Sequence, residues 1–565
     1  MDRLKRRRIP SLEARVDQPG EGGVLQRSYP VGRREFFRIY QGEPLRLEVS
    51  LAEGTPASRV ALHTDLNVEH PGTWHDIPFE NVGGGKFRFE ELALRCGLYR
   101  FKIKYARGGG QGWFLDRAPF SYVQVDPVSL KDIRMYTLIP TASGSVARWK
   151  EWLQHAHAMN FNTVHLLPIT AMGRSESPYS ARDLFDLDSS YHDPGDERDG
   201  LGQFEDFVEK AKKLGLRLCL DLVLNHVSPE SQLALSRPEW IVPDENEPDS
   251  FKRAGCWHQR TWIRWEDLVL VHYAHPQEST RKDIWRYMIQ YALFWANYAA
   301  HTGGMVRFDN LHSSHEVFIG ELTKVLRREY PNLVILAEYF TDPATLERMV
   351  AEWGLNLLVA TPWEYTFAPQ LREYISHLHK NSAKLRHLLS ATSHDSGAPA
   401  EEFFAPRAAL PRHAISTLFG TGQAGLVQGV EFATPRKVQF IGRNRPEPPN
   451  GGEDYRDLIA RLNDLMARHE VFRSTGNLRF IDDGHHAILA AHRYPPRAAG
   501  EAFLVFANLD IHNPQTITVD LGRQLPEHAG SAFEDVLAAR AERTEEGRLA
   551  VTLEPCGVKI LKLMK

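Results

Sequence analysis

The spacing of hydrophobic residues changes twice along this chain and divides it into three parts. From 30 to 127, hydrophobic and polar residues alternate in short runs such as PLRLEVSL and GLYRFKIKYA, separated by turns that contain glycine and proline. Because side chains alternate between the two faces of a strand, this pattern predicts an N-terminal β-sandwich. The alternation returns in runs such as AFLVFANLD and VKILKL and predicts a C-terminal β-sandwich over 475–565.

The central part, 128–474, alternates apolar runs with amphipathic helices. Eight runs favour strands: RMYTLIP, NTVHLLPI, LRLCLDLVL, GMVRFDN, LVILAEYF, LNLLVATP, LLSATSHD and AGLVQGV. The segment Gly202–Gly215 places several apolar side chains on one helical face, and 281–300 has the pattern of a longer helix. Eight strand–helix repeats predict an α/β fold, a (β/α)8 TIM barrel flanked by the two β-sandwiches.

Two segments fall outside these patterns. Residues 226–280, after the third strand, form a connection too long for an ordinary loop, and such insertions usually build a lid or a cleft wall. Residues 1–29 are basic and include the run KRRR, but they have no apolar stretch like that of a signal peptide. We therefore expect 1–29 to be a solvated tail.

Composition excludes several classes of function. A net charge of −4 gives no basic field for nucleic acid, so we expect no nucleic-acid partner. No apolar run reaches the roughly 20 residues that a membrane span needs. The four cysteines form no CxxC pair, which predicts neither a disulfide framework nor a zinc site. These features indicate a cytoplasmic protein, and they leave the oligomeric state open.

Three acidic residues each end one of the apolar runs: Asp309, Glu338 and Asp395. In a parallel barrel the carboxyl ends of all strands meet on one face, where catalytic groups gather. Carboxylates brought together there can cleave a glycosidic bond through an oxocarbenium-like transition state. Taken singly, each acid is equally consistent with a solvated carboxylate at a strand end.

The neighbours of these acids suggest different roles for them. Arg307 lies two positions before Asp309, on the same side of the strand, and would favour the ionised form that a nucleophile needs. Glu338 ends a strongly apolar run, where partial burial would let it keep a proton as a general acid must. For Arg307 and Asp309, an ordinary ion pair remains the alternative. Further polar groups are expected on the same face: Asp221, Asn225, His226, His394 and Tyr179.

These residues carry a resemblance to a known family. The runs DLVLNH (221–226) and RFD (307–309), with Glu338 and the pair His394-Asp395, resemble the ordered signature regions of the α-amylase superfamily. The resemblance implies that Asp309 is the nucleophile, Glu338 the general acid/base and Asp395 the stabiliser of the distorted sugar. Tyr179, Asp221, His226, Arg307 and His394 would bind the substrate.

The branch of the superfamily is less clearly marked. The sequence around Asp309 is similar to the glucanotransferase half of glycogen debranching enzymes, which favours a retaining 4-α-glucanotransferase acting on glycogen or malto-oligosaccharides. Maltosyltransferases that use maltose 1-phosphate share the Asp-Asn-x-His start and are an alternative. Hydrolysis of α-1,4-glucan is another, and a non-catalytic glycan-binding scaffold is an alternative of a different class.

The resemblance also bears on where an acceptor sugar binds and on whether a metal is needed. Transfer requires a sugar hydroxyl to outcompete water, so the acceptor must be well bound. The best candidates for its aromatic platform lie in the long connection: Trp257, Trp262, Trp265 and Tyr273. Amylase relatives often hold calcium through an asparagine that corresponds to Asn225, but no further oxygen ligands can be identified, so we predict no cofactor and no metal.

Overall fold

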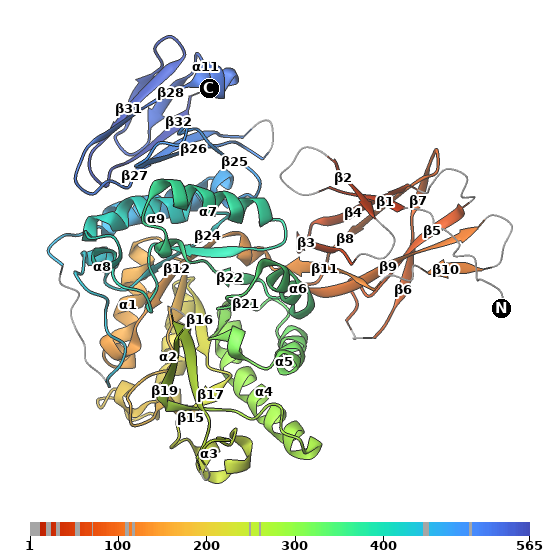
Figure 1. Ribbon diagram of the computed structural model, residues 1–565, viewed down its shortest axis with the longest axis vertical. Helices are drawn as coiled ribbons and strands as arrows, with labels where there is room; N and C mark the ends of the chain where they lie inside the picture. Colours follow the sequence, from red (N-terminus) through yellow and green to blue (C-terminus); the bar gives the residue numbers. More distant parts are fainter. Residues whose placement is uncertain are drawn as a thin grey trace. The chain divides into compact units, whose positions relative to one another are not determined.

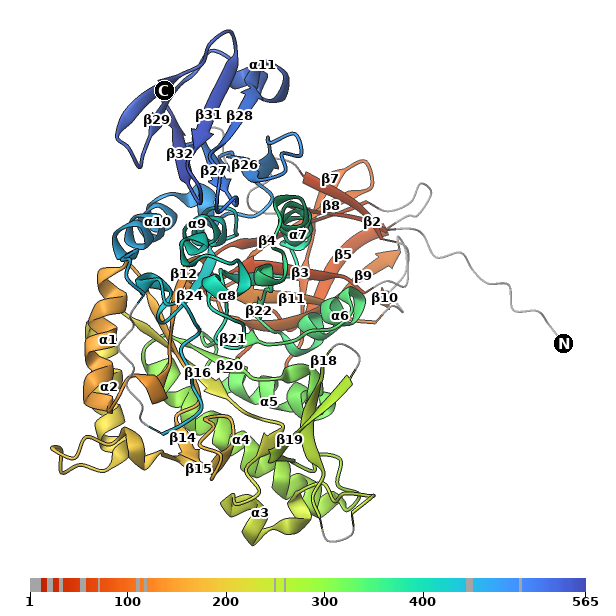
Figure 2. The same cartoon turned by 60° about the vertical axis from the view of Figure 1, so that its left-hand side comes forward.

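The computed structural model (Figures 1 and 2) describes most of the chain. The described ranges are 12–17, 24–29, 34–50, 57–69, 72–107, 112–115, 119–247, 250–258, 261–443, 451–496 and 500–564. Two compact units emerge: residues 1–128 with 347–354 and 496–498 form one, and the remainder forms the other. Each unit is described by itself below.

The first unit contains two β-sheets. One has the order β2 (Val24–Tyr29), β1 (Leu12–Asp17), β4 (Pro44–Ser50), β8 (Lys86–Leu92) and β7 (Glu80–Gly83). The other has the order β3 (Phe36–Tyr40), β11 (Ser121–Asp126), β9 (Gly97–Arg107), β5 (Ala57–Thr64) and β6 (His75–Pro78), with β10 (Trp113–Leu115) paired to β9. A single apolar cluster draws side chains from both sheets, as the alternating pattern predicts.

The N-terminal tail differs from expectation. Strands β1 and β2 pair with each other, and β1 also pairs with β4, so the sheet begins within the segment 1–29 that the sequence analysis treats as a solvated tail. The runs LEARVD and VLQRSY are short and contain charged residues, so their alternation is too weak to stand out in the sequence. Their pairing partner, β4, contributes the backbone hydrogen bonds that the local sequence does not reveal.

The centre of the second unit is a closed parallel barrel of eight strands, which confirms the predicted fold. In chain order, which is also the order around the barrel, the strands are β12 (Ile133–Leu138), β13 (Thr163–Leu166), β16 (Arg217–Leu222), β20 (Met305–Phe308), β21 (Val334–Ala337), β22 (Leu357–Val359), β23 (His387–Ser390) and β24 (Gln423–Val427). Each corresponds to one of the eight apolar runs. Parallel strands are buried on both faces, so they are recognisable as continuous apolar runs rather than as alternation.

Helices follow most of these strands. In chain order they are α1 (Val146–Ala158), α2 (Gly200–Lys213), α4 (Glu278–His301), α5 (Glu316–Glu329), α6 (Pro343–Trp353), α7 (Ala368–Asn381), α8 (Pro399–Glu402), α9 (Ala409–Leu418) and α10 (Arg456–Arg468). Helix α2 begins two residues earlier than predicted, because the Asp199 carboxylate accepts a hydrogen bond from the amide of Gly202 at 2.8 Å. It ends before Gly215, which adopts a φ of +71°.

The long connection after β16 folds into a small domain on the barrel. Strands β17 (His226–Val227), β19 (Thr261–Leu270) and β18 (Arg253–His258) form one antiparallel sheet, and helix α3 (Gln232–Ser236) lies between β17 and β18 along the chain. The side chains of Trp257 and Trp262 lie outside the described residues, and Trp265 is half-buried. The acceptor role expected of Tyr273 is wrong, because its ring is buried against Phe318 at 4.1 Å between centroids. A second hairpin, β14 (Thr170–Met172) with β15 (Ala181–Leu187), was not predicted.

The C-terminal sandwich belongs to the same unit as the barrel. Its larger sheet has the order β25 (Leu478–Phe480), β26 (Ile488–Arg493), β27 (Phe503–Asn508), β32 (Val558–Leu563), β29 (Ala532–Asp535) and β30 (Arg540–Arg543). One face of this sheet packs against α7, α9 and α10 of the barrel. The other face covers β28 (Gln515–Asp520), β31 (Arg548–Leu553) and the short helix α11 (Leu521–Gln524).

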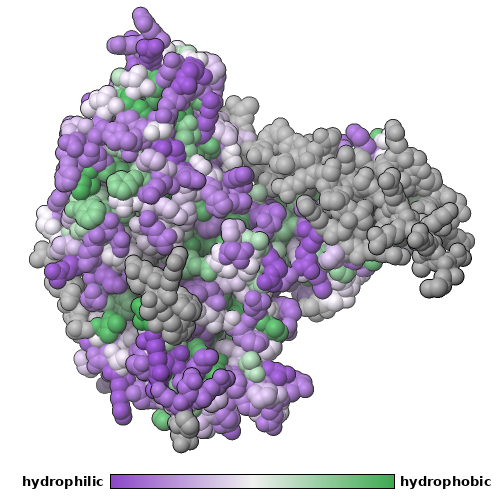
Figure 3. Space-filling view, in the orientation of Figure 1, coloured by the Kyte–Doolittle hydropathy of each residue, from purple (hydrophilic) through white to green (hydrophobic). Residues whose placement is uncertain are grey.

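The face of this unit that Figure 3 shows is mostly polar. On the face shown in Figure 3, hydrophilic side chains cover most of the described barrel and sandwich, and hydrophobic ones are scattered between them. No helix in the described ranges combines the length and apolar character that crossing a bilayer demands.

Candidate active site

The carboxyl ends of the barrel strands bring the predicted site residues together. In the parallel pairing of β16 with β20, Asp221 lies beside Arg307. Asp309 and Glu338 directly follow the last residues of β20 and β21, which are paired with each other. The backbone amide of Glu338 donates to the carbonyl of Phe308 at 3.0 Å and extends this pairing. Strand register therefore places four of the predicted residues around the end of β20: Asp221, Arg307, Asp309 and Glu338.

A single buried guanidinium joins these carboxylates. Nη1 of Arg307 donates to Oδ2 of Asp221 at 2.6 Å and to Oδ1 of Asp309 at 3.0 Å, while Nη2 donates to Oε2 of Glu338 at 2.8 Å. The Arg307 side chain is 4% exposed. The amide of Asn310 donates to the same Glu338 oxygen at 2.9 Å. Charge-assisted bonds of this kind fix both the position and the orientation of each carboxylate.

The charge balance of this cluster differs from the simple expectation for an Arg–Asp pair. Burial raises the pKa of Asp309 well above its usual value, and the nearby Glu338, Asp221 and Asp395 add to that effect against the opposing influence of Arg307. The guanidinium is shared among three carboxylates, so it cannot neutralise them all. The cluster therefore favours retention of one proton, and this proton is a property of the interacting group.

Asp221 is anchored from several sides. Tyr179 Oη donates to Asp221 Oδ2 at 3.1 Å, and His165 Nε2 lies 3.3 Å from the same oxygen. Although burial opposes ionisation, Arg307 and His165 lower the pKa of Asp221, which supports its role as a permanent anion beneath Arg307. His165 was not predicted as a site residue. Its only sequence signal is a histidine inside the apolar run NTVHLLPI.

The third predicted acid, Asp395, is held differently. His394 Nε2 lies 3.0 Å from Asp395 Oδ2 and 2.7 Å from Tyr179 Oη. The rings of His394 and Tyr179 are parallel within 7°. The side chain of Asp395 is 52% exposed, and Lys437 Nζ donates to its backbone carbonyl at 2.9 Å. Although burial opposes the shift, His394, Arg307 and Lys437 lower the pKa of Asp395.

The loop that follows β23 is fixed by two glutamates that the sequence analysis did not identify. The carboxylate of Glu402 accepts from the amide of Gly397 at 2.6 Å. That of Glu401 accepts from the amides of Ala398 at 2.8 Å and Lys437 at 2.9 Å. These bonds tie the loop carrying Asp395 to the segment carrying Lys437. In sequence they appear only as the common dipeptide Glu-Glu, so no local signal marks them.

Three buried polar side chains on the segments that follow β16 and β20 lack hydrogen-bond partners of good geometry among the described residues: Asn225, His226 and Asn310. Burial lowers the pKa of His226 to about 4, and its ring meets that of Trp265 at 6.3 Å between centroids. No direct bond from His226 to the Arg307 cluster is present.

A cavity of about 430 Å³ opens beside this constellation. Its walls include Arg307, Glu338, His394 and Asp395, together with the aromatic rings of Phe340 and Trp363 and the carboxylates of Glu364 and Glu402. Among its wall residues Arg307 alone has a guanidinium or ammonium group, and that group is already bonded to carboxylates. The volume suits a small ligand. The excess of carboxylates over cations favours a neutral, hydroxyl-rich molecule.

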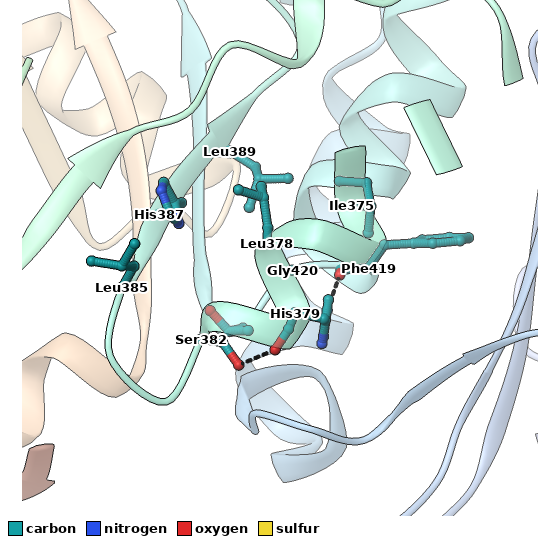
Figure 4. Close-up of a pocket in the computed structure, with 10 residues that line it drawn as sticks. Ile375, Leu378, His379, Ser382, Leu385, His387, Leu389, Phe419 and Gly420 are labelled. Atoms are coloured by element: carbon teal, nitrogen blue, oxygen red, sulfur yellow. Dashed lines mark hydrogen bonds between the residues drawn. The ribbon is translucent and has the colours of Figure 1, made fainter. Parts of the chain in front are cut away.

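A second pocket lies at the amino ends of the last two strands (Figure 4) and is unsuited to a sugar. Its volume is about 10 Å³, and its walls include Leu378, Leu389 and Phe419. The Nε2 atom of His379 is bonded to the carbonyl oxygen of Phe419 at 2.6 Å. Such a space holds no more than about one water molecule.

Comparison with known proteins places this site in context. The sequence model of the glycogen debranching enzyme, glucanotransferase domain, matches residues 126–254. An α-1,4-glucan:maltose-1-phosphate maltosyltransferase of Mycolicibacterium smegmatis is 24% identical over 90% of this chain and 72% of its own length. The enzyme of the same description from Myxococcus xanthus is 25% identical over 64% of this chain. The present chain covers just 56% of the Myxococcus protein.

Solved structures agree on the fold. An α-amylase from Lactobacillus plantarum superposes with a TM-score of 0.60 over 77% of this chain and 99% of its own, at 19% identity. The chain therefore has the fold of the α-amylases. Its carboxylates lie at the carboxyl ends of the barrel strands, where a TIM barrel places catalytic groups.

Proposed function

We propose that this protein is a retaining transferase that breaks and forms α-glucosidic bonds through a covalent intermediate on Asp309. The observation that supports this is the pair Asp309 and Glu338, bound by one buried guanidinium at 3.0 and 2.8 Å. Retention requires two carboxyl groups about 5–5.5 Å apart, one ionised and one protonated. In the cluster the raised pKa is that of Asp309, so the mechanism requires the shared proton to lie on Glu338 when Asp309 attacks.

The first half of the reaction transfers a glycosyl group to the enzyme. Asp309 Oδ attacks the anomeric carbon while Glu338 donates its proton to the departing oxygen, so the α-linkage becomes a β-glycosyl ester. In the second half Glu338, now ionised, removes the proton from an incoming 4-hydroxyl, which attacks the same carbon. Two inversions return the α-configuration. Arg307 keeps both carboxylates in place throughout.

The remaining site residues would bind the sugar on the non-reducing side of the cleaved bond. Asp395 and His394 can accept and donate hydrogen bonds to neighbouring hydroxyls, and half of the Asp395 side chain is accessible to a ligand. Tyr179 stacks in parallel on His394 and donates to Asp221, so its ring is fixed. His226 is buried, and its ring contacts Trp265.

We place maltose 1-phosphate first as the donor, with an α-1,4-glucan as acceptor. The curated relatives that support this choice are α-1,4-glucan:maltose-1-phosphate maltosyltransferases, and their likeness extends over 90% and 64% of this chain. The glucanotransferase match, by contrast, ends at residue 254, before Asp309 and Glu338. This ranking reverses the preference that the sequence motifs alone suggest.

Disproportionation of glucans, the activity of a 4-α-glucanotransferase, is the second candidate. The carboxylate-rich cavity favours it, because a neutral sugar leaving group experiences no repulsion from Glu364 or Glu402. The match to the glucanotransferase domain over 126–254 also supports it. The two candidates share the same intermediate and differ in the leaving group.

Two parallel reactions distinguish the donors. The protein is incubated with maltose 1-phosphate and maltohexaose, and separately with maltopentaose alone; phosphate release and chain lengths are measured. Maltosyl transfer predicts phosphate release with products two glucose units longer. Disproportionation predicts longer and shorter chains in the second reaction without phosphate. Products that are only shorter would identify a hydrolase and contradict transfer.

The variant Asp309→Asn should lose every one of these activities. A matched control is Asp283→Asn, because Asp283 is an exposed acid on α4 outside the site. Absence of activity with all donors in a folded wild-type protein would support a glycan-binding scaffold and contradict the proposal. Proton NMR of the product formed first reports its anomeric configuration, and a β-linked product would overturn the retaining mechanism.

A further inference from the structure

The C-terminal sandwich contains a histidine, His492, at a position of β26 that faces its apolar core. Along one face of β26, Ile488 and Ala490 belong to the core between the two sheets, and His492 is the next residue in that row. Successive side chains of a strand alternate between faces, so His492 faces the same core. It is 3% exposed.

Two further ligand groups lie beside this histidine. Glu527 and His528 follow Leu521 and Leu525, whose side chains belong to the same core and anchor the segment. The rings of His492 and His528 are 5.2 Å apart between centroids and nearly perpendicular, at 84°. One ligand atom from each of His492, Glu527 and His528 lies within 4.8 Å of the other two. It is the one such group of histidine, cysteine or carboxylate side chains in the described ranges.

The buried histidine is incompletely satisfied by the protein. His492 Nε2 is enclosed and has no hydrogen-bond partner among the described residues. A buried polar atom without a partner costs free energy, so such atoms are rare in native proteins and call for a ligand or a role. Burial, helped by His528, lowers the pKa of His492 to about 4, so its imidazole is neutral at physiological pH. Neutral imidazole is the form that binds metals.

We propose that His492, Glu527 and His528 form a zinc-binding site that joins β26 to the segment after α11. Two imidazoles and a carboxylate are a ligand set that zinc accepts, with water as the fourth ligand. Tetrahedral zinc with bonds of about 2.05 Å requires ligand atoms about 3.3 Å apart. Exposed Glu527 and half-buried His528 close the remaining gap by side-chain rotation.

The site has a structural rather than a catalytic role. All of its ligands belong to the C-terminal sandwich, whereas the proposed catalytic residues lie at the strand ends of the barrel. Zinc would fasten Pro526–His528 to the central strands of the larger sheet. One neighbouring charge opposes it: Arg479 of β25 is paired directly with His492, and its positive charge lowers the pKa of that histidine.

Cobalt provides a spectroscopic probe of the site. The untagged full-length protein is treated with EDTA, desalted and titrated with Co²⁺, and the visible spectrum is recorded. We expect one equivalent of cobalt with the intense bands of a tetrahedral ion, which one equivalent of Zn²⁺ displaces. The variant His528→Gln should lose these bands and weaken metal binding at least about tenfold.

Two variants serve as controls. His486 is an exposed histidine of the same sandwich outside the cluster, and His486→Gln should titrate like the wild type. Arg479→Gln removes the opposing charge and should tighten cobalt binding about threefold to tenfold at low salt. Absence of tetrahedral bands in the wild type, or unchanged bands in His528→Gln, would overturn the proposal. Circular dichroism of each variant establishes that it is folded.

Discussion

Two of the three candidate catalytic acids differ from the third in how the fold holds them. Asp309 and Glu338 follow barrel strands directly, have side chains 10% and 18% exposed, and share one buried arginine. Asp395 lies on a loop, is 52% exposed and depends on His394 and Lys437. The strand-bound pair is preorganised for bond cleavage, whereas the loop-bound acid can adjust to a sugar. Variants of the two groups should therefore fail in different ways.

The largest effect is expected at the proposed nucleophile. Asp309→Asn removes the group that forms the covalent bond, and kcat should fall by at least about 10⁴-fold. The thermal midpoint should hold or rise, because burial and three neighbouring carboxylates raise the pKa of Asp309 and a neutral amide relieves their repulsion. Initial rates and a melting curve measure both. Retention of more than about a hundredth of wild-type kcat would contradict covalent catalysis by Asp309.

Glu338→Gln should produce a loss that depends on the leaving group. General acid catalysis contributes about 10²–10⁴-fold to the rate. The rate of transfer from a malto-oligosaccharide donor should therefore fall by that amount. With maltosyl fluoride, whose leaving group needs no proton, formation of the glycosyl-enzyme should change far less. Comparing the two donors in single-turnover experiments tests this difference. Equal losses with both donors would indicate a positioning role for Glu338 instead.

Arg307→Lys should lower the reaction rate and change the ionisation of Asp309 and Glu338. A lysine cannot bond Asp221, Asp309 and Glu338 together, and each lost charge-assisted bond is worth about 1.5–3 kcal/mol, or roughly 10–100-fold in rate. Arg307 lowers the pKa of Asp309 against burial, so weakening it raises that pKa further. The acid limb of kcat/KM should then move to higher pH. An unshifted limb would contradict the role of Arg307 in the charge balance.

The smallest effect is expected at the loop-bound acid. Lys437→Met removes one hydrogen bond to the Asp395 carbonyl, worth about 1 kcal/mol, so kcat/KM should fall about fivefold. Lys437 also lowers the pKa of Asp395. Because its pKa is lowered in the folded protein, ionised Asp395 stabilises the native state above its usual pKa of 3.8, and this stabilisation disappears as the pH falls below that value. The variant Lys437→Met should lose part of this stabilisation.

A pH series of melting curves measures this loss. The difference in thermal midpoint between wild type and Lys437→Met should be largest above about pH 5 and shrink at lower pH. Lys324→Met is the control, because Lys324 is an exposed lysine on α5 and should change neither quantity. A difference that grows toward acid would contradict the lowered pKa of Asp395.

Much of the fold was predictable because the relevant signals are local. Buried parallel strands need continuous apolar runs, and eight such runs mark the barrel. Residues missed by the sequence analysis act through distant partners instead. His165 matters because it reaches Asp221, and Glu402 because its carboxylate accepts from the amide of Gly397. Tyr273 is predicted to belong to the acceptor platform, but its hydroxyl donates to the backbone carbonyl of Leu224.

The sequence by itself determined the barrel, its two flanking sandwiches and the acids at the strand ends, because alternation and apolar runs are properties of neighbouring residues. Only the tertiary structure decided that the Arg307 guanidinium is bonded to the carboxylates of Asp221, Asp309 and Glu338 at once. It also brought His492 to Glu527 and His528 across the sandwich. Charge sharing and ligand geometry depend on distances of a few ångströms between segments far apart in the chain, and folding sets those distances.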